Sequence, residues 1–484
     1  MLDKLKIKWV YAISAIFIVL NSIFIINELY WFCLIPVILL ILLFLFFSVD
    51  ILLLLIVFFT PLSVNLSDFD LNVGVFIPTE PLLFCVMLMF LFSIAFRGRY
   101  DSKIFKHPIS VIIIIYITWI FITSITSSMP VVSFKFLVSK LWFIIPFYFL
   151  GIQLFKEQKN FKRFIWLYMI AFCVVIGYTI YNHSIYGFDE QSSHWVMSPF
   201  YNDHTSYGAL LAMFIPFSFA FIFNKKESKS IRVSSLFVFI LLCVAVVLSY
   251  SRAAWLSLAI ALIVFLILKL KINYKVVIGG IIALSAVFLI YREDIYRDIE
   301  KNKQDSSKDY VKHIQSMSNI SSDASNLERI NRWKSALRMF KLRPVFGWGP
   351  GTYQFKYAPF QHSNEKTIIS TNAGDMGNAH SEYIGPLAEE GIIGTLSMLA
   401  IVLIVIYTGV KLYKRVDTKE LRLITITILV SLITYFIHGL LNNFLDTDKA
   451  SVPFWGMIAM LVALDIYYPK KEAAKKNIEK KVSE

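Results

Sequence analysis

Long apolar stretches alternate with short polar segments along almost the entire chain. Most are long enough to cross a hydrocarbon layer of roughly 30 Å as a helix, which takes about 20 residues. The pattern therefore predicts an all-α, polytopic membrane protein, a helical bundle of about fourteen spans. We expect them at residues 9–26, 31–47, 50–63, 81–96, 109–126, 136–154, 164–182, 207–223, 233–249, 253–268, 276–291, 384–409, 423–440 and 453–468.

The polar segments between these spans differ in charge in an alternating manner. Residues 64–80 and 183–206 contain acidic residues and no Lys or Arg. Lys and Arg concentrate instead in the alternate segments, and such segments stay on the cytoplasmic side. We therefore predict a multi-pass protein of the bacterial inner (cytoplasmic) membrane with both termini cytoplasmic. The basic segments are 97–107, 156–163, 224–232, 269–275, 411–422 and the tail 469–484.

One segment on the outer side is much longer than the others. It spans residues 292–383 and contains three of the eight histidines. The chain thus divides into eleven spans (1–291), this large periplasmic loop (292–383), three further spans (384–468) and a basic tail (469–484). We expect function to concentrate in the large loop, because binding and catalytic residues are often found in loops held by a rigid scaffold.

A short amphipathic helix is predicted inside the large loop. Ser325 and Glu328 have the spacing of a capping box, and the helical pattern that follows ends at Pro344. We expect this helix to lie on the membrane face. Its apolar stripe comprises Ile330, Trp333, Leu337 and Phe340, and its basic side comprises Arg329, Arg332, Lys334, Arg338 and Lys341.

Composition narrows the function classes. Hydrophobic residues make up 57% of the chain and the mean hydropathy is +0.66, which excludes an ordinary soluble protein. The net charge of +14 resides in the short loops, where it sets topology and meets anionic membrane lipid, so nucleic acid is not an expected partner. The four cysteines all lie in apolar spans, which argues against disulfides in the outer loops.

The segment PVFGWGPGTY, residues 344–353, is rich in glycine and includes Gly349 and Gly351. It follows a helix and lacks the Gly-Lys-Ser/Thr ending of a nucleotide-binding P-loop. A tight turn that brings the backbone close to another element explains the glycines better. Exposed amide groups there could also contact an anion.

Two single residues are candidates for chemistry. Arg252, in YSRAAW, is a cation at a predicted membrane boundary, where it either extends to the interface or binds an anion. His380, in NAHSEYIGPLAEEGIIG, precedes the twelfth span, with Glu382 and Glu389 nearby. A histidine can act as a general base near neutral pH, although a plain surface histidine is the alternative interpretation.

No metal site is expected. The HSE triplet at residues 380–382 lacks metal-ligand spacing, and the chain has no H-E-x-x-H motif or cysteine pair. The acidic triplets at 68–70 and 446–448 resemble the metal site of nucleotide-sugar transferases, but both are predicted to face outward, where nucleotide sugars are scarce. We interpret them as solvated loop acids.

Three segments taken in order resemble one family. YSRAAW, ERINRWKSALRMFKLRPVFGWGPGTY and AHSEYIGPLAEEGIIG are similar to the O-antigen ligase family, which includes O-antigen ligases, O-antigen polymerases and bacterial O-oligosaccharyltransferases. The resemblance covers roughly residues 207–410. Many members have Asn after the histidine, where this chain has Ser381, so the local hydrogen bonding of that position differs.

The resemblance implies an activity and roles for particular residues. The donor would be a glycan on undecaprenyl diphosphate, and no cofactor would be needed. Arg252 and Arg329, the latter four residues before Trp333, would bind the diphosphate, and His380 would be the catalytic base. Supporting roles would fall to Trp333, Gly349, Gly351, Glu382 and Glu389.

Several alternatives remain open from the sequence. A ligase would transfer the glycan to a lipid A core sugar, a polymerase to another lipid-linked repeat, and an O-oligosaccharyltransferase to a protein. A polysaccharide transporter or flippase has a similar number of spans, but it would be expected to show two related halves, which this chain does not. Lys140, inside the sixth span, suggests either a further polar cavity or a lysine that extends to the interface.

Overall fold

A computed structural model describes residues 2–69, 74–97, 100–273, 275–280, 282–283, 286–287, 289–291, 327–367, 370 and 377–468. The predicted polar part of the large loop, 292–325, and the basic tail, 469–484, lie outside these residues. Two compact units are present, Met1–Leu55 and Ile56–Glu484.

The first unit is built from α1 (Leu2–Ile26), α2 (Ile35–Phe47) and the beginning of α3 (Val49–Phe59). Residues Lys8–Ile26 of α1 are long and apolar enough to cross a membrane, and large apolar side chains such as Trp9 are exposed along it, as lipid-facing side chains would be. The apolar helices Phe32–Phe47 and Val49–Leu62 are shorter than such a span. The predicted spans at 31–47 and 50–63 are therefore not confirmed.

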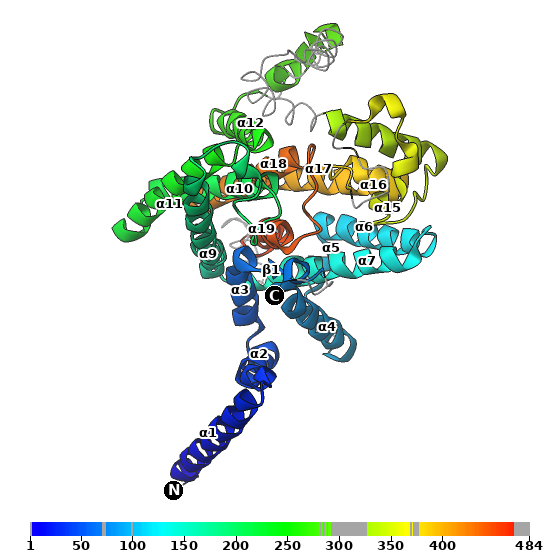
Figure 1. Ribbon diagram of the computed structural model, residues 1–484. Coiled ribbons are helices and arrows are strands. Elements are labelled where there is room, and N and C mark those ends of the chain that lie inside the picture. The colour runs from blue at the N-terminus through cyan, green and yellow to red at the C-terminus, as the bar shows by residue number, and fades with distance from the viewer. Residues whose placement is uncertain are drawn as a thin grey trace, which may run out of the picture. The chain divides into compact units, whose positions relative to one another are not determined.

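The second unit is almost entirely helical (Figure 1). Its only strands among the described residues are β1 (Val64–Asn65) and β2 (Phe76–Ile77), which pair antiparallel. Its helices are α4 (Thr79–Arg97), α5 (Ser102–Lys106), α6 (Pro108–Ile125), α7 (Pro130–Ile144), α8 (Gly151–Leu154), α9 (Gln158–Ile185), α10 (His204–Phe223), α11 (Lys229–Leu248), α12 (Arg252–Lys269), α15 (Tyr353–Lys356), α16 (Ile384–Glu389), α17 (Gly391–Arg415), α18 (Lys419–His438) and α19 (Asp448–Tyr467), with short 3₁₀ or π turns at Thr60–Leu62, Leu66–Phe69, Ile145–Leu150, Ser192–His194, Ala358–Phe360 and Ser363–Glu365.

Eleven helices in the described part of the chain are long and apolar enough to span a membrane. They confirm an all-α, multi-pass membrane protein, while the count of fourteen remains a prediction. The predicted span 276–291 is only partly described. The predicted span 384–409 starts later than expected, because α16 ends at Glu389 and Gly391, with φ 69°, opens the separate helix α17.

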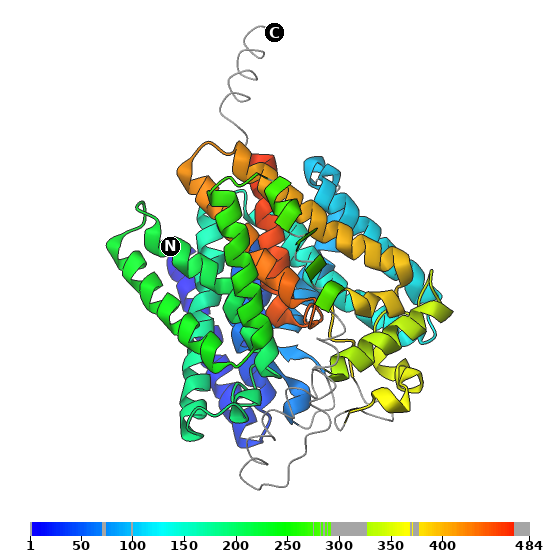
Figure 2. The same ribbon diagram turned by 90° about the horizontal axis from the view of Figure 1, so that it is seen from above.

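The core of this unit surrounds α19, the red helix of Figure 2, which packs against α17, α18, α7, α8 and α10. Nearly all of α19 is buried, including two charged residues in its first turn. The Oδ2 atom of Asp448 accepts hydrogen bonds of 2.5 Å from the hydroxyls of Ser63 and Thr79, and Lys449 donates to the Thr60 carbonyl oxygen at 2.7 Å. The interpretation of residue 448 as a solvated loop acid is therefore wrong, since its carboxylate is satisfied inside the fold.

Side chains of the predicted cytoplasmic segments meet one another at one end of these helices. Ion pairs join Lys226 to Glu420 at 2.7 Å and Arg415 to Asp465 at 2.6 Å, and His107 also contacts Asp465. Segments that the charge pattern assigns to one side of the membrane thus also lie at one end of the helices in the structure. The described part of the large loop lies at the opposite end of these helices, where the candidate chemistry is found.

Candidate functional site

The described part of the large loop folds around a helix at residues 327–342. Its buried face differs from the predicted apolar stripe, since Leu337 is 44% exposed while Ala336 and Met339 are fully buried. These two residues pack in a small core with Tyr353, Tyr357, Ala379 and Ala388. The helix packs on its own loop rather than only on a membrane surface, and its buried face combines the small Ala336 with the larger Met339.

The predicted basic side of this helix is largely paired with acids of the same loop. Arg332 is buried and donates from Nε to Glu328 at 2.8 Å, and Arg338 and Lys334 both bind Glu365, at 2.5 and 3.1 Å. Three of the five residues on the predicted basic side are therefore paired within the loop. The carboxylate of Glu328 is used by Arg332, and its capping partner Ser325 lies outside the described residues.

The glycine-rich segment docks on the turn between α16 and α17 through its backbone. The amide of Trp348 donates to the carbonyl of Ala388 at 3.0 Å, and the amide of Gly349 donates to the carbonyl of Glu389 at 2.8 Å. The Glu389 carboxylate accepts from the amide of Tyr353 at 2.9 Å and also from that of Gly351. Gly349 and Gly351 therefore serve the packing of the turn, and their amides are used within the fold.

The contact between these two segments depends on glycine. Gly347 and Gly391 adopt φ values of 64° and 69°, a region that favours glycine. A Cβ atom on Gly347 would collide with the backbone of Glu389, and one on Gly391 would collide with the backbone of Val345. The structure thus supports the interpretation of residues 344–353 as a tight turn for close backbone approach.

His380 lies in a short irregular strip before α16 and adopts φ 48°, uncommon for a residue with a side chain. Its amide donates to the side-chain oxygen of Asn378 at 3.0 Å, and the carbonyl of Asn378 accepts from Arg332 at 3.0 Å. On the other side of the histidine, the amide of Glu382 donates to the carbonyl of Gly439 at 2.8 Å. The strip is thus fixed at both ends, to the loop helix and to the residue after α18.

Ser381 and Glu382 anchor this strip to the residues around it. The hydroxyl of Ser381 accepts from the amides of Tyr383 and Ile384, both at 3.3 Å, so it stabilises the turn into α16. The buried Glu382 carboxylate accepts from the Tyr435 hydroxyl at 2.8 Å and from the amide of Leu445 at 2.9 Å. Glu382 therefore ties His380 to the connection between α18 and α19.

Arg329 and His380 are brought into one electrostatic environment. Burial lowers the pKa of His380 to about 4, and the positive charges of Arg332 and Arg329 contribute, while Asp203 opposes the shift. Burial also lowers the pKa of Arg329, again against Asp203. His380 is consequently neutral at pH 7 and able to accept a proton, beside a guanidinium that remains charged.

Sequence reasoning missed three residues at this site. The charges of Arg329 and Asp203, which act on His380, also act on His204 and His438. His438 contacts the carbonyl oxygen of Thr205 at 3.1 Å through Nε2. Asp203 caps α10, accepting from the amides of Thr205 and Ser206, which leaves its charge only partly available to Arg329. In the sequence, the three residues share one property: each is a polar residue at the end of a span, on the side of the large loop. That property could have marked them as candidates.

Arg252 is the first residue of α12 and its side chain is exposed. α12 packs against α10 and α18, and a Cβ atom on Gly208 of α10 would meet Ser251 at 2.7 Å. Arg252 therefore lies at the same helix ends as His204 and His438. Trp333 is half-buried on the loop helix, one turn after Arg329.

Comparison with known proteins gives one match. Residues 237–399 match a family model described as O-antigen ligase. This part of the chain is similar to the O-antigen ligase family. The match confirms the resemblance drawn from the three sequence motifs. No curated protein matches the chain.

The O-antigen ligase segment, residues 237–399, contains Arg252, Arg329 and His380, and proteins of that family are associated with glycan transfer in polysaccharide biosynthesis. The helix ends that complete their surroundings lie outside it. Asp203 and His204 precede the segment, and His438 follows it. The site is therefore assembled from the family segment and from the helices packed against it.

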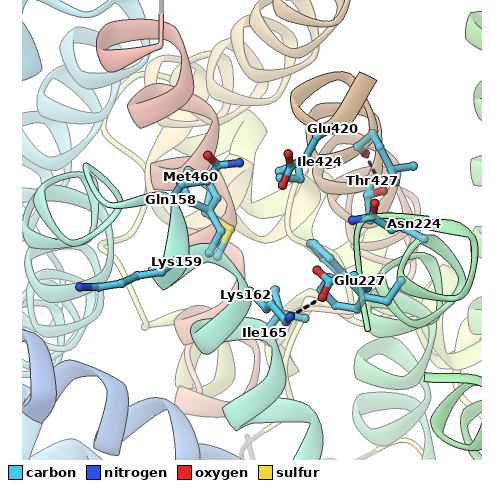
Figure 3. Close-up of a pocket in the computed structure, with 15 residues that line it drawn as sticks. Gln158, Lys159, Lys162, Ile165, Asn224, Glu227, Glu420, Ile424, Thr427 and Met460 are labelled. Carbon is cyan, nitrogen blue, oxygen red and sulfur yellow. Dashed lines mark hydrogen bonds and ion pairs between the residues drawn. The ribbon is translucent and has the colours of Figure 1, made fainter. Parts of the chain in front are cut away.

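A cavity lies wholly outside the O-antigen ligase segment, among α9, α10, α18 and α19 (Figure 3). Figure 3 shows Lys162 directed at Glu227 across one side of it, and these two side chains form an ion pair. Glu420, on another wall, pairs with Lys226. This cavity belongs to the end with the basic segments, and no histidine lines it, so it is not the candidate reaction site.

Proposed function

We propose that this protein transfers a glycan from undecaprenyl diphosphate to an acceptor hydroxyl at the periplasmic face of the bacterial inner membrane. The observation that carries the proposal is a buried, neutral His380 on which the charges of Arg332 and Arg329 act, all three within the O-antigen ligase segment. A fixed cation suits a diphosphate leaving group, and a neutral imidazole suits a hydroxyl that must lose a proton.

Arg329 and Arg252 would bind the diphosphate of the donor. A guanidinium offers several N–H donors in a planar fork that matches phosphate oxygens. The partial burial of Arg329 strengthens its attraction for an anion, since the local dielectric is lower than that of water. As the glycosidic bond to the diphosphate breaks, the charge that develops on the leaving group is stabilised by these arginines.

His380 would act as the general base. The acceptor oxygen attacks the anomeric carbon while its proton passes to a nitrogen of the imidazole. The bond from the anomeric carbon to the diphosphate breaks in the same displacement, which inverts the configuration. The leaving diphosphate is stabilised by the two arginines, so the mechanism needs neither a metal ion nor ATP.

The orientation is part of this proposal. The basic segments that meet at the far end of the helices would be cytoplasmic by the positive-inside rule, with both termini on that side. The large loop and His380 would then face the periplasm, where lipid-linked glycans are presented. An acceptor on lipid A core would make the protein a ligase, the version we favour, and an acceptor on another lipid-linked repeat would make it a polymerase.

The deciding experiment uses purified protein, an undecaprenyl-diphosphate glycan and each candidate acceptor. His380→Ala should lower the transfer rate by roughly 10²- to 10⁴-fold, the usual contribution of a general base. Donor binding should survive, because the diphosphate is assigned to the arginines.

The same assay with EDTA tests the metal-free step, and the rate should not change. Near-normal transfer by His380→Ala would remove it as the base. Activity lost to EDTA and restored by magnesium would overturn the metal-free mechanism.

A further inference from the structure

A cavity of about 860 Å³, including its open mouth, lies beside the His380 strip. Asn378 and Ser381, on either side of the histidine, belong to its lining. The cavity continues between the spans, where Tyr116 of α6, Lys140 of α7 and Trp455 of α19 line it. It therefore connects the candidate reaction site with a polar interior, and gives the unexplained Lys140 a location.

Three polar atoms on the walls of this cavity are buried and have no hydrogen-bond partner within the described chain. They are Oε2 of Glu390, Oδ1 of Asn443 and Nε1 of Trp455. Glu390 and Trp455 are 0% and 2% exposed. Leaving such groups unsatisfied is unfavourable, so a polar ligand that pairs with them would gain affinity. Oδ1 of Asn443 accepts a hydrogen bond and Nε1 of Trp455 donates one, while the carboxyl of Glu390 accepts or donates according to its protonation. Sugar hydroxyl groups can pair with all three.

The charged groups of the cavity favour a neutral occupant over an anion or a cation. Glu382, Glu389, Glu390 and Asp446 line it, against the single ammonium of Lys140, which donates to the carbonyl of Leu445 at 2.8 Å. A diphosphate would meet several acidic groups there. Burial raises the pKa of Glu389 to about 7 and that of Glu390 to about 8, which lets both carry a proton near neutral pH and removes the attraction for cations.

Aromatic rings complete the lining. Tyr116, Phe136, Tyr353 and Trp455 present apolar ring surface next to the polar atoms. A pocket with apolar walls and a few fixed polar groups binds small ligands that combine both characters. A neutral sugar ring has hydroxyls at its edge and C–H groups on its faces, and it matches this combination.

We propose that this cavity is a subsite for a neutral sugar residue of the transferred or accepting glycan, in which the hydroxyls bind Glu390, Asn443 and Trp455. The inference rests on the proposed function and assigns a part of the substrate to a part of the site. The diphosphate binds at the arginines, and the sugar next to the reacting carbon or hydroxyl extends past Asn378 and Ser381 into the acidic cavity.

The test measures binding of free sugars to the full-length protein in detergent by saturation-transfer NMR. The probes are the methyl glycosides of glucose, galactose, N-acetylglucosamine and N-acetylgalactosamine, which lack lipid and phosphate. At least one should receive saturation from the wild-type protein. Trp455→Phe keeps the ring and removes the donor, and Asn443→Ala removes an acceptor. Each should weaken binding about fivefold, the equivalent of one hydrogen bond of about 1 kcal/mol.

Glu227→Gln, in the cavity at the opposite helix end, is the matched control and should leave binding unchanged. Equal thermal unfolding of the variants confirms their folding, and Asn443→Ala carries the test if Trp455→Phe does not fold. Absence of saturation for all four sugars, or equal binding in wild type and both variants, would overturn the subsite. His380→Ala should keep sugar binding, so loss of the subsite and loss of the proposed transfer reaction are separate results.

Discussion

The imidazole of His380 is held in an environment that keeps it unprotonated. Its burial and the nearby charges of Arg332 and Arg329 lower its pKa from 6.5 to about 4. A base works only while it is neutral, and a lowered pKa extends the neutral range downward in pH. The same environment makes His380 a weaker base, which the developing charge on the diphosphate must compensate.

This gives a pH prediction. The acid limb of kcat/KM for glycan transfer should be centred near pH 4 rather than near pH 6.5, so the rate should be almost constant between about pH 5.5 and 7. Initial transfer rates at acceptor concentrations well below KM, which give kcat/KM, would be measured across this range, with circular dichroism to confirm that the protein stays folded. A half-maximal rate at pH 6.5 would contradict a buried, neutral His380.

The two arginines can be tested by a change that keeps their charge. Arg252→Lys and Arg329→Lys should each lower kcat/KM more than tenfold, a loss of about 1.4 kcal/mol or more, because an ammonium cannot form the planar fork on a diphosphate. Lys334→Arg, on the exposed side of the same loop helix, is the control and should leave transfer unchanged. A wild-type rate in Arg252→Lys would favour an arginine that merely extends to the interface.

Single residues were predicted from sequence where one short motif contains them. His380 and Arg329 stand in recognisable segments, and the structure brings them together. His204 and His438 could not be found this way, since each is an isolated histidine whose neighbourhood is created by the packing of α10 against α18. Such residues acquire meaning only from tertiary contacts.

Among the elements, the loop helix shows what periodicity can and cannot predict. Its existence was predicted from residues 325–343, but the face that it buries was not. A hydrophobic stripe predicts the buried face when the partner is lipid or an apolar core. Here Asn331 and Arg332 contact Gln361 and the strip at 378–380, so polar contacts join the apolar ones of Ala336 and Met339 on the buried face.

The contact between the glycine-rich turn and the start of α17 gives a stability prediction. Gly347→Ala places a Cβ atom against the backbone of Glu389 and forces a strained φ, so the thermal unfolding temperature should fall by about 5 °C or more. Gly177→Ala, in α9, meets nothing within 4 Å and should be neutral or slightly stabilising. Equal unfolding temperatures for the two variants in a fluorescence melt would show that the contact is not needed.

For the whole molecule, hydropathy predicted the class and most of the spans. Ten of the predicted spans coincide with long apolar helices that the structure describes, besides the later start of α17. The region 31–63 was ambiguous because it is one apolar run, and its helices are short. The side of the membrane on which each end lies remains a prediction from charge.

That orientation can be tested by accessibility to a membrane-impermeant thiol reagent. In a background without the four native cysteines, Ser363→Cys in the large loop should react in intact cells whose outer membrane is permeable to the reagent. Ser230→Cys, exposed in the first turn of α11, should react only after the inner membrane is opened. The reverse pattern would place His380 in the cytoplasm and remove the periplasmic reaction.

The attachment of the His380 strip to Gly439 has a consequence for recombination between relatives. The matched family segment ends at residue 399, yet the backbone that fixes His380 belongs to the end of α18. A chimera that exchanges residues 237–399 alone would join a foreign strip to a native anchor, whereas one extended to residue 449 would carry both. In this protein, the unit that can be inherited or transplanted with its chemistry intact is therefore larger than the stretch by which its family is recognised.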